Sequence, residues 1–249
     1  MRITFLGTNG WYTDRNGNTT CIFIETDSCY IVLDAGNGLH KIDEYVKEQD
    51  KPIYLFLSHF HLDHISGLHV LGKFDFEQGM TICCPEGGSE VLGNIIRQPY
   101  TMPFEQLPLR VDIREMEEGS QEGFPFGLVS RELMHSSKCF GYRFVIDSKV
   151  VSYCTDTGYC DPAVDISRGA DLLITECSLK PGQRTESWPH LNPEDAAGLA
   201  KEVNAGELIM IHFDAAIYCT MKDRKDAEAA AKKIFAKTTA ARDGLVVEI

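Results

Sequence analysis

The chain has 249 residues, with 24 lysines and arginines against 37 aspartates and glutamates, and its net charge is −13. This balance argues against a basic protein that binds nucleic acid non-specifically, and a composition of 43% hydrophobic and 24% charged residues is typical of a folded globular protein. No apolar run reaches the roughly 20 residues of a membrane span, no signal peptide is evident, and the nine scattered cysteines form no CxxC pair, so we expect a cytoplasmic protein with reduced thiols and no membrane partner.

Short runs rich in β-branched, aliphatic and aromatic residues predict strands along the whole chain, because both their lengths and their compositions fit. In chain order these runs are Ile3–Leu6, Cys21–Glu25, Tyr30–Leu33, Ile53–Leu57, Thr81–Cys84, Val111–Met116, Gly141–Ile146, Val150–Tyr153, Leu172–Thr175, Leu208–Ile211 and Leu245–Ile249.

Helical patterns are fewer and lie between the strands. We expect helices over Leu39–Glu48 and Gly88–Ile96, a surface loop over Gln98–Pro108, and further helices after Asn192 and over Lys222–Lys237. Asn192 is placed as an N-cap, with proline at the first helical position and acids in the first turn. No linker-like stretch divides the chain, so the sequence predicts a single domain over residues 1–249, with two strand-rich halves packed together and helices outside.

The segment after the Ile53–Leu57 strand concentrates residues that bind metals. In an extended chain, residues two apart point the same way, so His59 and His61 can converge on one ion. A following turn lets Asp63 and His64 face a second point nearby. Imidazole and carboxylate ligands suit zinc, manganese or iron. The alternative is a histidine-rich surface loop, but this HxHxDH pattern arises by chance in roughly one such sequence in a thousand.

Three more residues of ligand type follow strand-like runs: His135, Asp156 and His212. A single histidine at the end of a strand is usually structural. Together with the HxHxDH cluster, however, these residues predict a bound metal centre.

The same residues carry a resemblance to a known family. Ser58–His64, His135, Asp156-Thr-Gly and His212-Phe resemble the ligand motifs of the metallo-β-lactamase superfamily of hydrolases, and the likeness spans essentially the whole chain. The segment from His190 to Ala197 is similar to the branch that contains ribonuclease Z and PhnP-like phosphodiesterases. The resemblance implies an α+β fold, a four-layer αβ/βα sandwich with two sheets flanked by helices and a dinuclear metal site at one edge.

The resemblance also implies roles for individual residues. It assigns seven ligands to two divalent ions: His59, His61 and His135 to one, Asp63, His64 and His212 to the other, and Asp156 as the bridge. The expected ions are Zn²⁺, or else Mn²⁺ or Fe²⁺. With two aspartates they leave a local charge of about +2, so a bridging water loses a proton readily and the resulting hydroxide can attack a phosphodiester. Asp63 and His190 are assigned as catalytic residues, with His190 binding phosphate and acting as a general acid.

The expected activity is that of a phosphodiesterase acting on a small cyclic phosphate or nucleotide diester. Alternatives are a tRNA 3′-processing endoribonuclease, a lactonase or thioesterase, and a metal-binding regulatory module without catalysis. Ribonuclease Z proteins usually insert a long tRNA-binding arm between the positions of His135 and Asp156. Here the interval of 156 − 135 = 21 residues holds only two strands and a turn. The sequence therefore favours a small phosphodiester over extended nucleic acid as the partner, and leaves a homodimer open.

Five other residues receive weaker assignments. Asp34 is expected to support a ligand histidine. Glu176 orients a histidine or is structural, and Arg143 contacts phosphate or forms a salt bridge. His40 and His69 have no motif around them and are expected at the surface.

Overall fold

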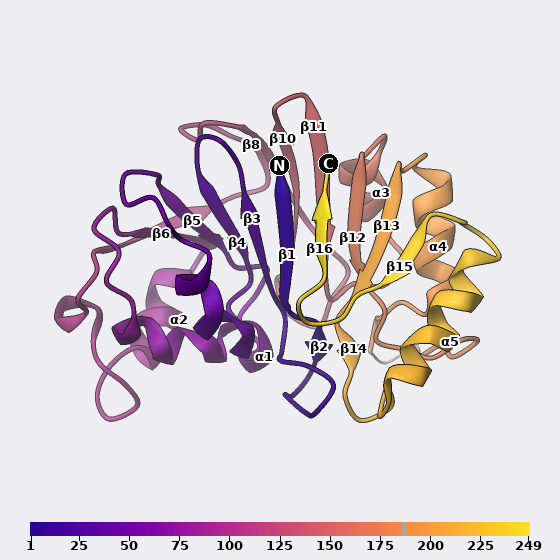
Figure 1. Ribbon diagram of the computed structural model, residues 1–249, viewed down its shortest axis with the longest axis horizontal. Helices are drawn as coiled ribbons and strands as arrows, with labels where there is room; N and C mark the ends of the chain where they lie inside the picture. The colour runs from indigo at the N-terminus through magenta and orange to yellow at the C-terminus, as the bar shows by residue number, and fades with distance from the viewer. Residues whose placement is uncertain (186–187) are drawn as a thin grey trace.

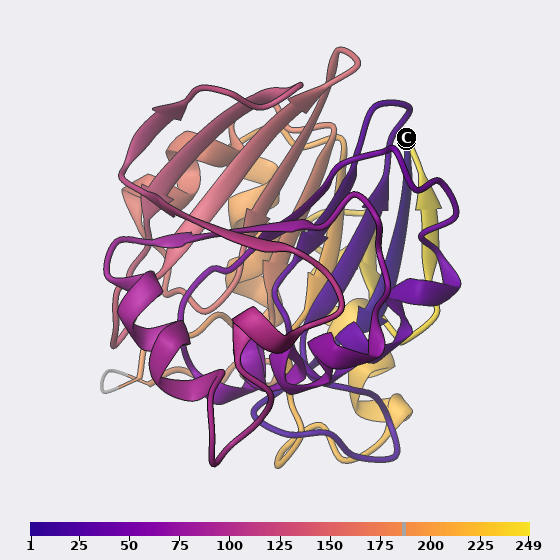
Figure 2. The ribbon, with the colours of Figure 1, turned by 90° about the vertical axis from the view of Figure 1, so that its left-hand side faces the viewer.

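The computed structural model describes residues 1–185 and 188–249, and its strands form two seven-stranded sheets that lie against each other (Figures 1 and 2). In the first sheet the three strands from β1 to β4 are antiparallel to their neighbours, and the strands from β4 to β7 run parallel. In spatial order this sheet consists of β16 (Val246–Glu248), β1 (Arg2–Gly7), β3 (Cys21–Glu25), β4 (Tyr30–Leu33), β5 (Ile53–Phe56), β6 (Met80–Pro85) and β7 (Val111–Met116).

The second sheet is also mixed, with parallel pairing from β11 to β15 and antiparallel pairing from β8 to β11. In spatial order it consists of β15 (Thr238–Ala240), β13 (Glu207–Ile211), β12 (Leu172–Glu176), β11 (Lys149–Cys154), β10 (Phe140–Ile146), β9 (Gly127–Glu132) and β8 (Gly119–Gln121). A short parallel ladder of β2 (Asn9–Gly10) with β14 (Phe213–Asp214) joins the segments that leave β1 and β13, at the lower edge of Figure 1.

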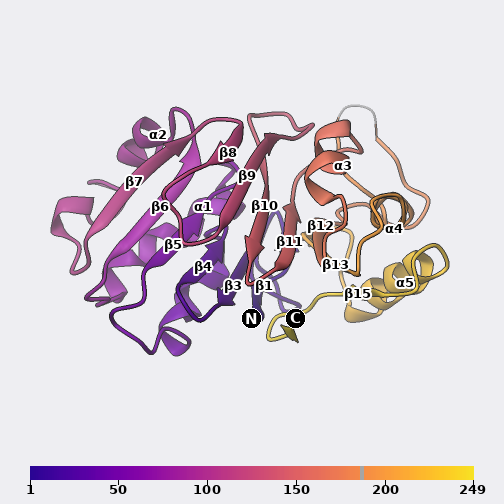
Figure 3. The same cartoon turned by 90° about the horizontal axis from the view of Figure 1, so that it is seen from above.

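Helices cover the outer face of each sheet, which gives the four layers that the family resemblance implies (Figure 3). The first sheet carries the 3₁₀ helices η1 (Asn37–Glu44), η2 (Ser66–Lys73) and η3 (Phe104–Gln106) with α1 (Leu62–Ile65) and α2 (Gly88–Ile95). The second sheet carries α3 (Asp161–Ser167), α4 (Pro193–Glu202) and α5 (Met221–Lys232). In the described part of the chain, no helix is long and apolar enough to cross a membrane.

The alternation of side chains along the strands builds three hydrophobic layers. In β3, Ile22 and Ile24 face the second sheet, whereas Phe23 between them faces the helices of its own half. Successive side chains of a strand point to opposite faces, and here both faces are buried. This double burial explains why the strands are continuous apolar runs in the sequence.

Every predicted strand is present, and the capped helix after Asn192 is confirmed as α4, whereas two helix predictions need correction. The segment predicted as a helix over Leu39–Glu48 is the 3₁₀ helix η1, whose Gly38 approaches the backbone of Leu6 so closely that a Cβ there would lie 2.7 Å from it. The last helix ends at Lys232 rather than Lys237, because the chain turns back to the second sheet and the carbonyl of Lys237 accepts a hydrogen bond from Leu208.

Candidate metal centre

The predicted ligands lie at one edge of the sandwich, where strands from both sheets end. His59 follows β5 in the first sheet, and His135, Asp156 and His212 follow β9, β11 and β13 in the second. His61 is the N-cap of α1, so the turn into this helix separates the first two histidines of the HxHxDH segment from Asp63 and His64. Residues that are far apart in the sequence therefore meet because these strands finish at the same edge.

The first ligand group consists of His59, His61, His135 and Asp156, whose nitrogen and oxygen atoms all lie within 4.8 Å of one another. Nε2 of His135 is 3.2 Å from Nδ1 of His61. Oδ2 of Asp156 is 3.8 Å from Nε2 of His59 and 3.9 Å from Nε2 of His135.

The second ligand group consists of Asp63, His64 and His212. The Nε2 atoms of His64 and His212 are 3.0 Å apart, and each lies 3.2 Å from Oδ1 of Asp156. Asp156 thus faces the first group with one carboxylate oxygen and the second group with the other. This is the grouping that the family resemblance implies, and the assignment of each residue as a ligand stays a prediction.

The polar atoms of both groups fit a cation. Among the described side chains, the buried Nε2 of His59 has no hydrogen-bond partner, and neither has Nδ1 of His135. Buried polar groups without partners are rare in native proteins. Imidazole and carboxylate donors form the ligand sets of zinc hydrolases. Two neighbouring His/Asp groups that share Asp156 are consistent with a dinuclear metal site.

The local electrostatics favour the metal-binding protonation states of His59, His135 and both carboxyls. Burial lowers the pKa of His59 well below its ordinary value and that of His135 to about 4, so both imidazoles are neutral at pH 7. Burial opposes ionisation of Asp63 and Asp156, but His64 beside Asp63 and His212 beside Asp156 hold the pKa of each carboxyl well below its usual range. Neutral imidazoles and ionised carboxylates are the forms that coordinate a metal. At His64 and His212, burial opposes protonation, but the nearby carboxylates, Asp156 foremost, together outweigh burial and raise the pKa of both rings, so a bound cation would have to displace their protons.

A further layer of hydrogen bonds orients the candidate ligands. Oδ2 of Asp34 is 2.8 Å from Nδ1 of His64, which is the expected contact with a candidate ligand. The hydroxyl of Ser58 is 3.0 Å from Nδ1 of His59, and that of Ser178 is 2.9 Å from Nδ1 of His212. Partners of this kind fix the ring orientation and the tautomer of a ligating histidine.

His190 and Glu176 form a pair next to both ligand groups. Nδ1 of His190 is 2.6 Å from Oε1 of Glu176, and the ring centre of His190 is 5.7 Å from that of His135 and 6.0 Å from that of His212. Burial would lower the pKa of His190, but the charge of Glu176 and its hydrogen bond outweigh burial and raise this pKa to about 9. Two roles are expected for Glu176, orienting a histidine or a structural one, and its contact with His190 supports the first.

The structure corrects the prediction for Arg143. Its guanidinium contacts neither a ligand group nor a carboxylate among the described contacts, and instead donates to the carbonyls of Ile166 and Arg168 at the end of α3. His40 and His69 are exposed, as expected, and Nδ1 of each ring donates to the backbone carbonyl three residues earlier.

Left-handed backbone conformations gather at this edge. Trp11, Asp34, Asp156 and His212 have φ values of 70°, 56°, 47° and 53°. Residues other than glycine rarely adopt such values, and these conformations cluster at functional sites, where surrounding contacts hold them.

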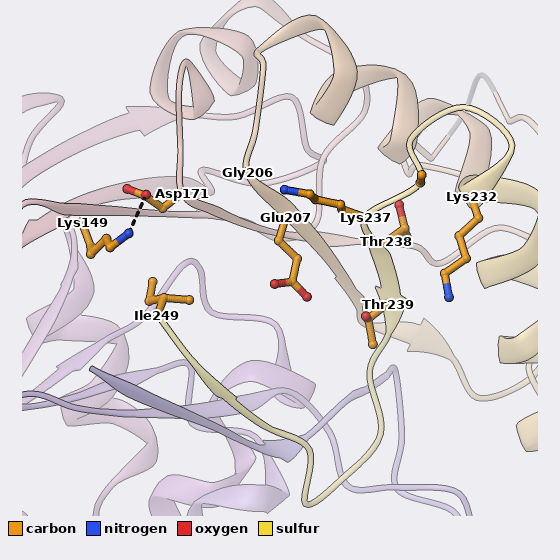
Figure 4. A pocket seen from close by; sticks show the side chains of 10 residues that line it. Lys149, Asp171, Gly206, Glu207, Lys232, Lys237, Thr238, Thr239 and Ile249 are labelled. Atoms are coloured by element: carbon orange, nitrogen blue, oxygen red, sulfur yellow. Dashed lines mark hydrogen bonds and ion pairs between the residues drawn. The ribbon is translucent and has the colours of Figure 1, made fainter.

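A separate hollow of about 570 Å³ lies at the opposite edge, beside the start of β13 and the last residue of the chain (Figure 4). Its lining includes Lys149, Lys232 and Lys237. Lys149 is paired with Asp171 at 3.1 Å and Lys232 with Glu228 at 2.5 Å, and none of the predicted ligands lines the hollow.

Comparisons with protein families and with known proteins point to the same superfamily that the ligand motifs resemble. Residues 30–213 match the family model described as the beta-lactamase superfamily domain. The chain is 27% identical over 217 residues to Probable metallo-hydrolase YhfI of Bacillus subtilis, covering 86% of this chain and 87% of that protein. It is 25% identical over 276 residues to Ribonuclease BN of Escherichia coli, covering 85% and 88%.

Solved structures show the same fold. The crystal structure of YhfI superposes with a TM-score of 0.81 at 24% identity, covering 100% of this chain and 98% of that one. A diphosphatase from the PhnP family gives a TM-score of 0.75 at 18% identity, covering 100% and 97%.

Proposed function

Because this chain belongs to the metallo-β-lactamase superfamily of hydrolases, we propose that it is a metal-dependent phosphodiesterase that cleaves a small cyclic phosphate or nucleotide diester. The observation that carries the proposal is the pair of ligand groups divided by the two oxygens of Asp156. Two divalent ions held there, zinc before manganese or iron, would acidify a water and polarise the phosphate oxygens. In the overall reaction water adds across one P–O ester bond and leaves a phosphomonoester and an alcohol.

The residues of the chain support this reaction in defined ways. Asp63 and Asp156 balance the positive charge, and the hydrogen bond from the backbone N–H of Trp11 to Oδ2 of Asp63, at 2.8 Å, helps to hold the Asp63 carboxylate in place. His190 is held by Glu176 through Nδ1, so its other nitrogen is left to bind phosphate or to protonate the leaving alkoxide. General acid catalysis of this kind typically contributes about 10²–10⁴-fold in rate.

A second candidate is 3′-processing of tRNA, which the similarity to Ribonuclease BN favours. We rank it behind a small diester for two reasons. The interval between His135 and Asp156 is filled by β10 and β11, as the sequence predicts. The match to Ribonuclease BN runs over 276 positions, more than the 249 residues of this chain, so that protein has insertions that this chain lacks.

Metal analysis followed by a hydrolysis screen on the same preparation tests the proposal. The screen contains 2′,3′- and 3′,5′-cyclic nucleotides, cyclic ribose phosphate, bis-p-nitrophenyl phosphate, p-nitrophenyl phosphate, a lactone and pre-tRNA. We expect about two ions per chain and cleavage of diesters, with monoesters as poor substrates because their second charge repels a hydroxide nucleophile. Rapid phosphate release from the monoester with the diesters untouched, or hydrolysis of the lactone alone, would refute it, and efficient cleavage of pre-tRNA would promote the second candidate.

Two variants test the assignment of the bridge. Asp156→Ala should lose metal and activity together, whereas Glu176→Ala should keep its metal and lose activity, since Glu176 contacts His190 and not the first ligand group. Full retention of both ions in a double Asp63→Ala/Asp156→Ala variant would end the assignment of these ligands.

The role of His190 is tested by changing the leaving group. His190→Ala should keep both ions and lose far more rate on a ribose or alkyl diester than on bis-p-nitrophenyl phosphate, whose leaving group needs no proton. His69→Ala, which removes an exposed histidine, is the matched control. An equal loss on both substrates would show that His190 binds or packs rather than donates a proton.

A further inference from the structure

The two tryptophans of the chain, Trp11 and Trp188, both lie at the candidate metal centre, and both are exposed. The Trp188 ring is nearly parallel to that of His61, with a ring-centre distance of 6.1 Å and an angle of 14°, and its edge-on neighbour is His135 at 6.0 Å. Trp188 therefore lies beside the first ligand group, with 47% of its surface accessible to solvent.

Trp11 lies beside the second ligand group. Its backbone N–H donates to Asp63, its φ is 70°, and its side chain is 65% exposed. Leu62, 74% exposed, stands between His61 and Asp63 in the sequence, and Met134, 52% exposed, precedes His135. Large exposed apolar side chains grouped at one place mark a binding surface.

A charged centre beside exposed aromatic side chains restricts the chemical class of ligand that can contact both. A sugar phosphate would use the charged groups but has no planar aromatic face to stack on an indole. A planar base attached through its sugar to the phosphate would use both, because base–aromatic stacking contributes about 1–3 kcal/mol per base.

We infer that the substrate is a phosphodiester that carries a nucleoside, and that Trp188 is the residue on which its base stacks. The inference rests on the proposed phosphodiesterase activity and narrows its substrate class. It makes Trp188 a specificity-determining residue that acts on binding, while Trp11 borders the same site on the side of Asp63.

Because the chain has only two tryptophans, its fluorescence reports on this surface directly. In the metal-loaded Trp11→Phe variant the signal comes from Trp188 alone. We expect adenosine 5′-monophosphate to quench it saturably, ribose 5-phosphate and inorganic phosphate to leave it nearly unchanged, and the adenosine compound to bind about 5- to 100-fold more tightly than ribose 5-phosphate. Equal quenching by all three ligands, or quenching by none, would overturn the inference.

Kinetics provide a second test with matched substrates, 2′,3′-cyclic adenosine monophosphate and the base-free cyclic ribose phosphate. Trp188→Ala should lower kcat/KM for the nucleotide about 5- to 100-fold, mainly through KM, and change the base-free substrate less than about twofold. Trp188→Phe should recover most of the loss. Tyr100→Ala, which removes an aromatic ring that is 74% exposed elsewhere, is the control and should change neither.

The outcomes separate this inference from the proposed activity. Nucleotide-specific quenching without hydrolysis of any diester would refute the activity and leave the base site in place. Hydrolysis of both substrates with equal losses in Trp188→Ala would overturn the base site and keep the activity. Adding a short single-stranded RNA distinguishes the source of the base, since cleavage of RNA with the same dependence on Trp188 would assign the nucleoside to an RNA end.

Discussion

The backbone conformation of Asp156 positions its carboxylate between the two ligand groups. Asp156 lies two residues after the end of β11, has a left-handed backbone conformation with φ 47°, and presents one oxygen to each ligand group. Such a conformation costs roughly 1–3 kcal/mol, and it persists only where surrounding contacts determine it. The hydroxyl of Thr155 contributes one of these contacts by donating to Oδ1 at 2.8 Å. His212 has the same type of conformation at a similar cost. Both conformations therefore lower the stability of the fold while they position the two side chains at the site.

A prediction at this scale concerns Gly10, which packs against the ring of His212. A Cβ at Gly10 would lie 2.6 Å from Cε1 and 2.7 Å from Nδ1 of that ring. Gly10→Ala should therefore displace His212, reduce the metal content and lower activity by at least about tenfold, at a stability cost of about 1–3 kcal/mol from overpacking. Elemental analysis and urea denaturation measure these effects.

Gly198→Ala is the matched control, because a Cβ there, inside α4, would meet nothing within 4 Å. It should leave metal and activity unchanged and raise stability by up to about 1 kcal/mol, since alanine is the better helix former. If Gly10→Ala kept two ions and full rate, His212 would not be a ligand.

Among the strands of the two large sheets, those that are apolar runs were predictable from the sequence, and β8, β9 and β15, which contain few apolar residues, were not. The strand β4 is apolar throughout and β3 is apolar except for its last residue, Glu25, so composition alone indicates them. In β9, by contrast, the fully buried positions are Leu128 and Ser130, and a serine interrupts the apolar pattern. The seven-residue helix α3 follows the N-cap Cys160, whose side chain makes no capping hydrogen bond, and is too short to show a helical period.

The candidate site also contains some residues that could be predicted from the sequence and others that could not. The ligand-type residues that follow strands could be predicted from the sequence, because these strands end at the same edge of the sandwich. The supporting hydroxyls of Tyr153, which donates to Asp34 at 2.6 Å, and of Ser178 could not be predicted, since they act through contacts 119 and 34 residues away. For Ser178 a signal was available: it lies two residues after Glu176, and alternate residues of an extended segment point the same way.

The N-terminus of α4 gives a prediction at the scale of the element. Oδ1 of the N-cap Asn192 accepts from the backbone of Asp195 at 2.8 Å, and Nδ2 donates to Gln183 at 2.8 Å. Asn192→Ala should lower the free energy of unfolding by about 0.5–2 kcal/mol. Because His190 lies two residues before this cap, the variant should also lower kcat on alkyl diesters while it keeps its metal.

Thr220→Ala separates the two effects. Thr220 caps α5 in a reciprocal pair with Asp223, and neither residue belongs to the ligand groups. A similar loss of stability with unchanged kcat is expected. If both variants lost activity to the same degree, the effect of Asn192 on the site would be one of general stability.

In the whole molecule, the candidate ligands connect the two halves of the sandwich. One side supplies the HxHxDH segment after β5, and the other supplies His135, Asp156 and His212. The halves also share a hydrophobic layer between the sheets, and β16 returns from the end of the chain to pair with β1 at the edge of the first sheet. Metal ions at the joint would therefore act as cross-links that the unfolded chain cannot form.

Removal of the metal should accordingly lower thermal stability. An ion present at 100 times its dissociation constant stabilises the folded state by about 2.7 kcal/mol, which for a chain of this size is about 5–10 °C in the unfolding midpoint. Titration with a chelator, followed by calorimetry, should show this decrease for each ion lost, and added Zn²⁺ should reverse it. Asp156→Ala, which lacks the proposed bridge, should have a lower unfolding midpoint from the start, and the chelator should change that midpoint less.

Loss of the metal should also increase hydrogen exchange in the segments after β5, β11 and β13, and leave it constant at the opposite edge, around Lys149 and Glu207. An unchanged midpoint after measured loss of both ions would show that the two halves hold together without them.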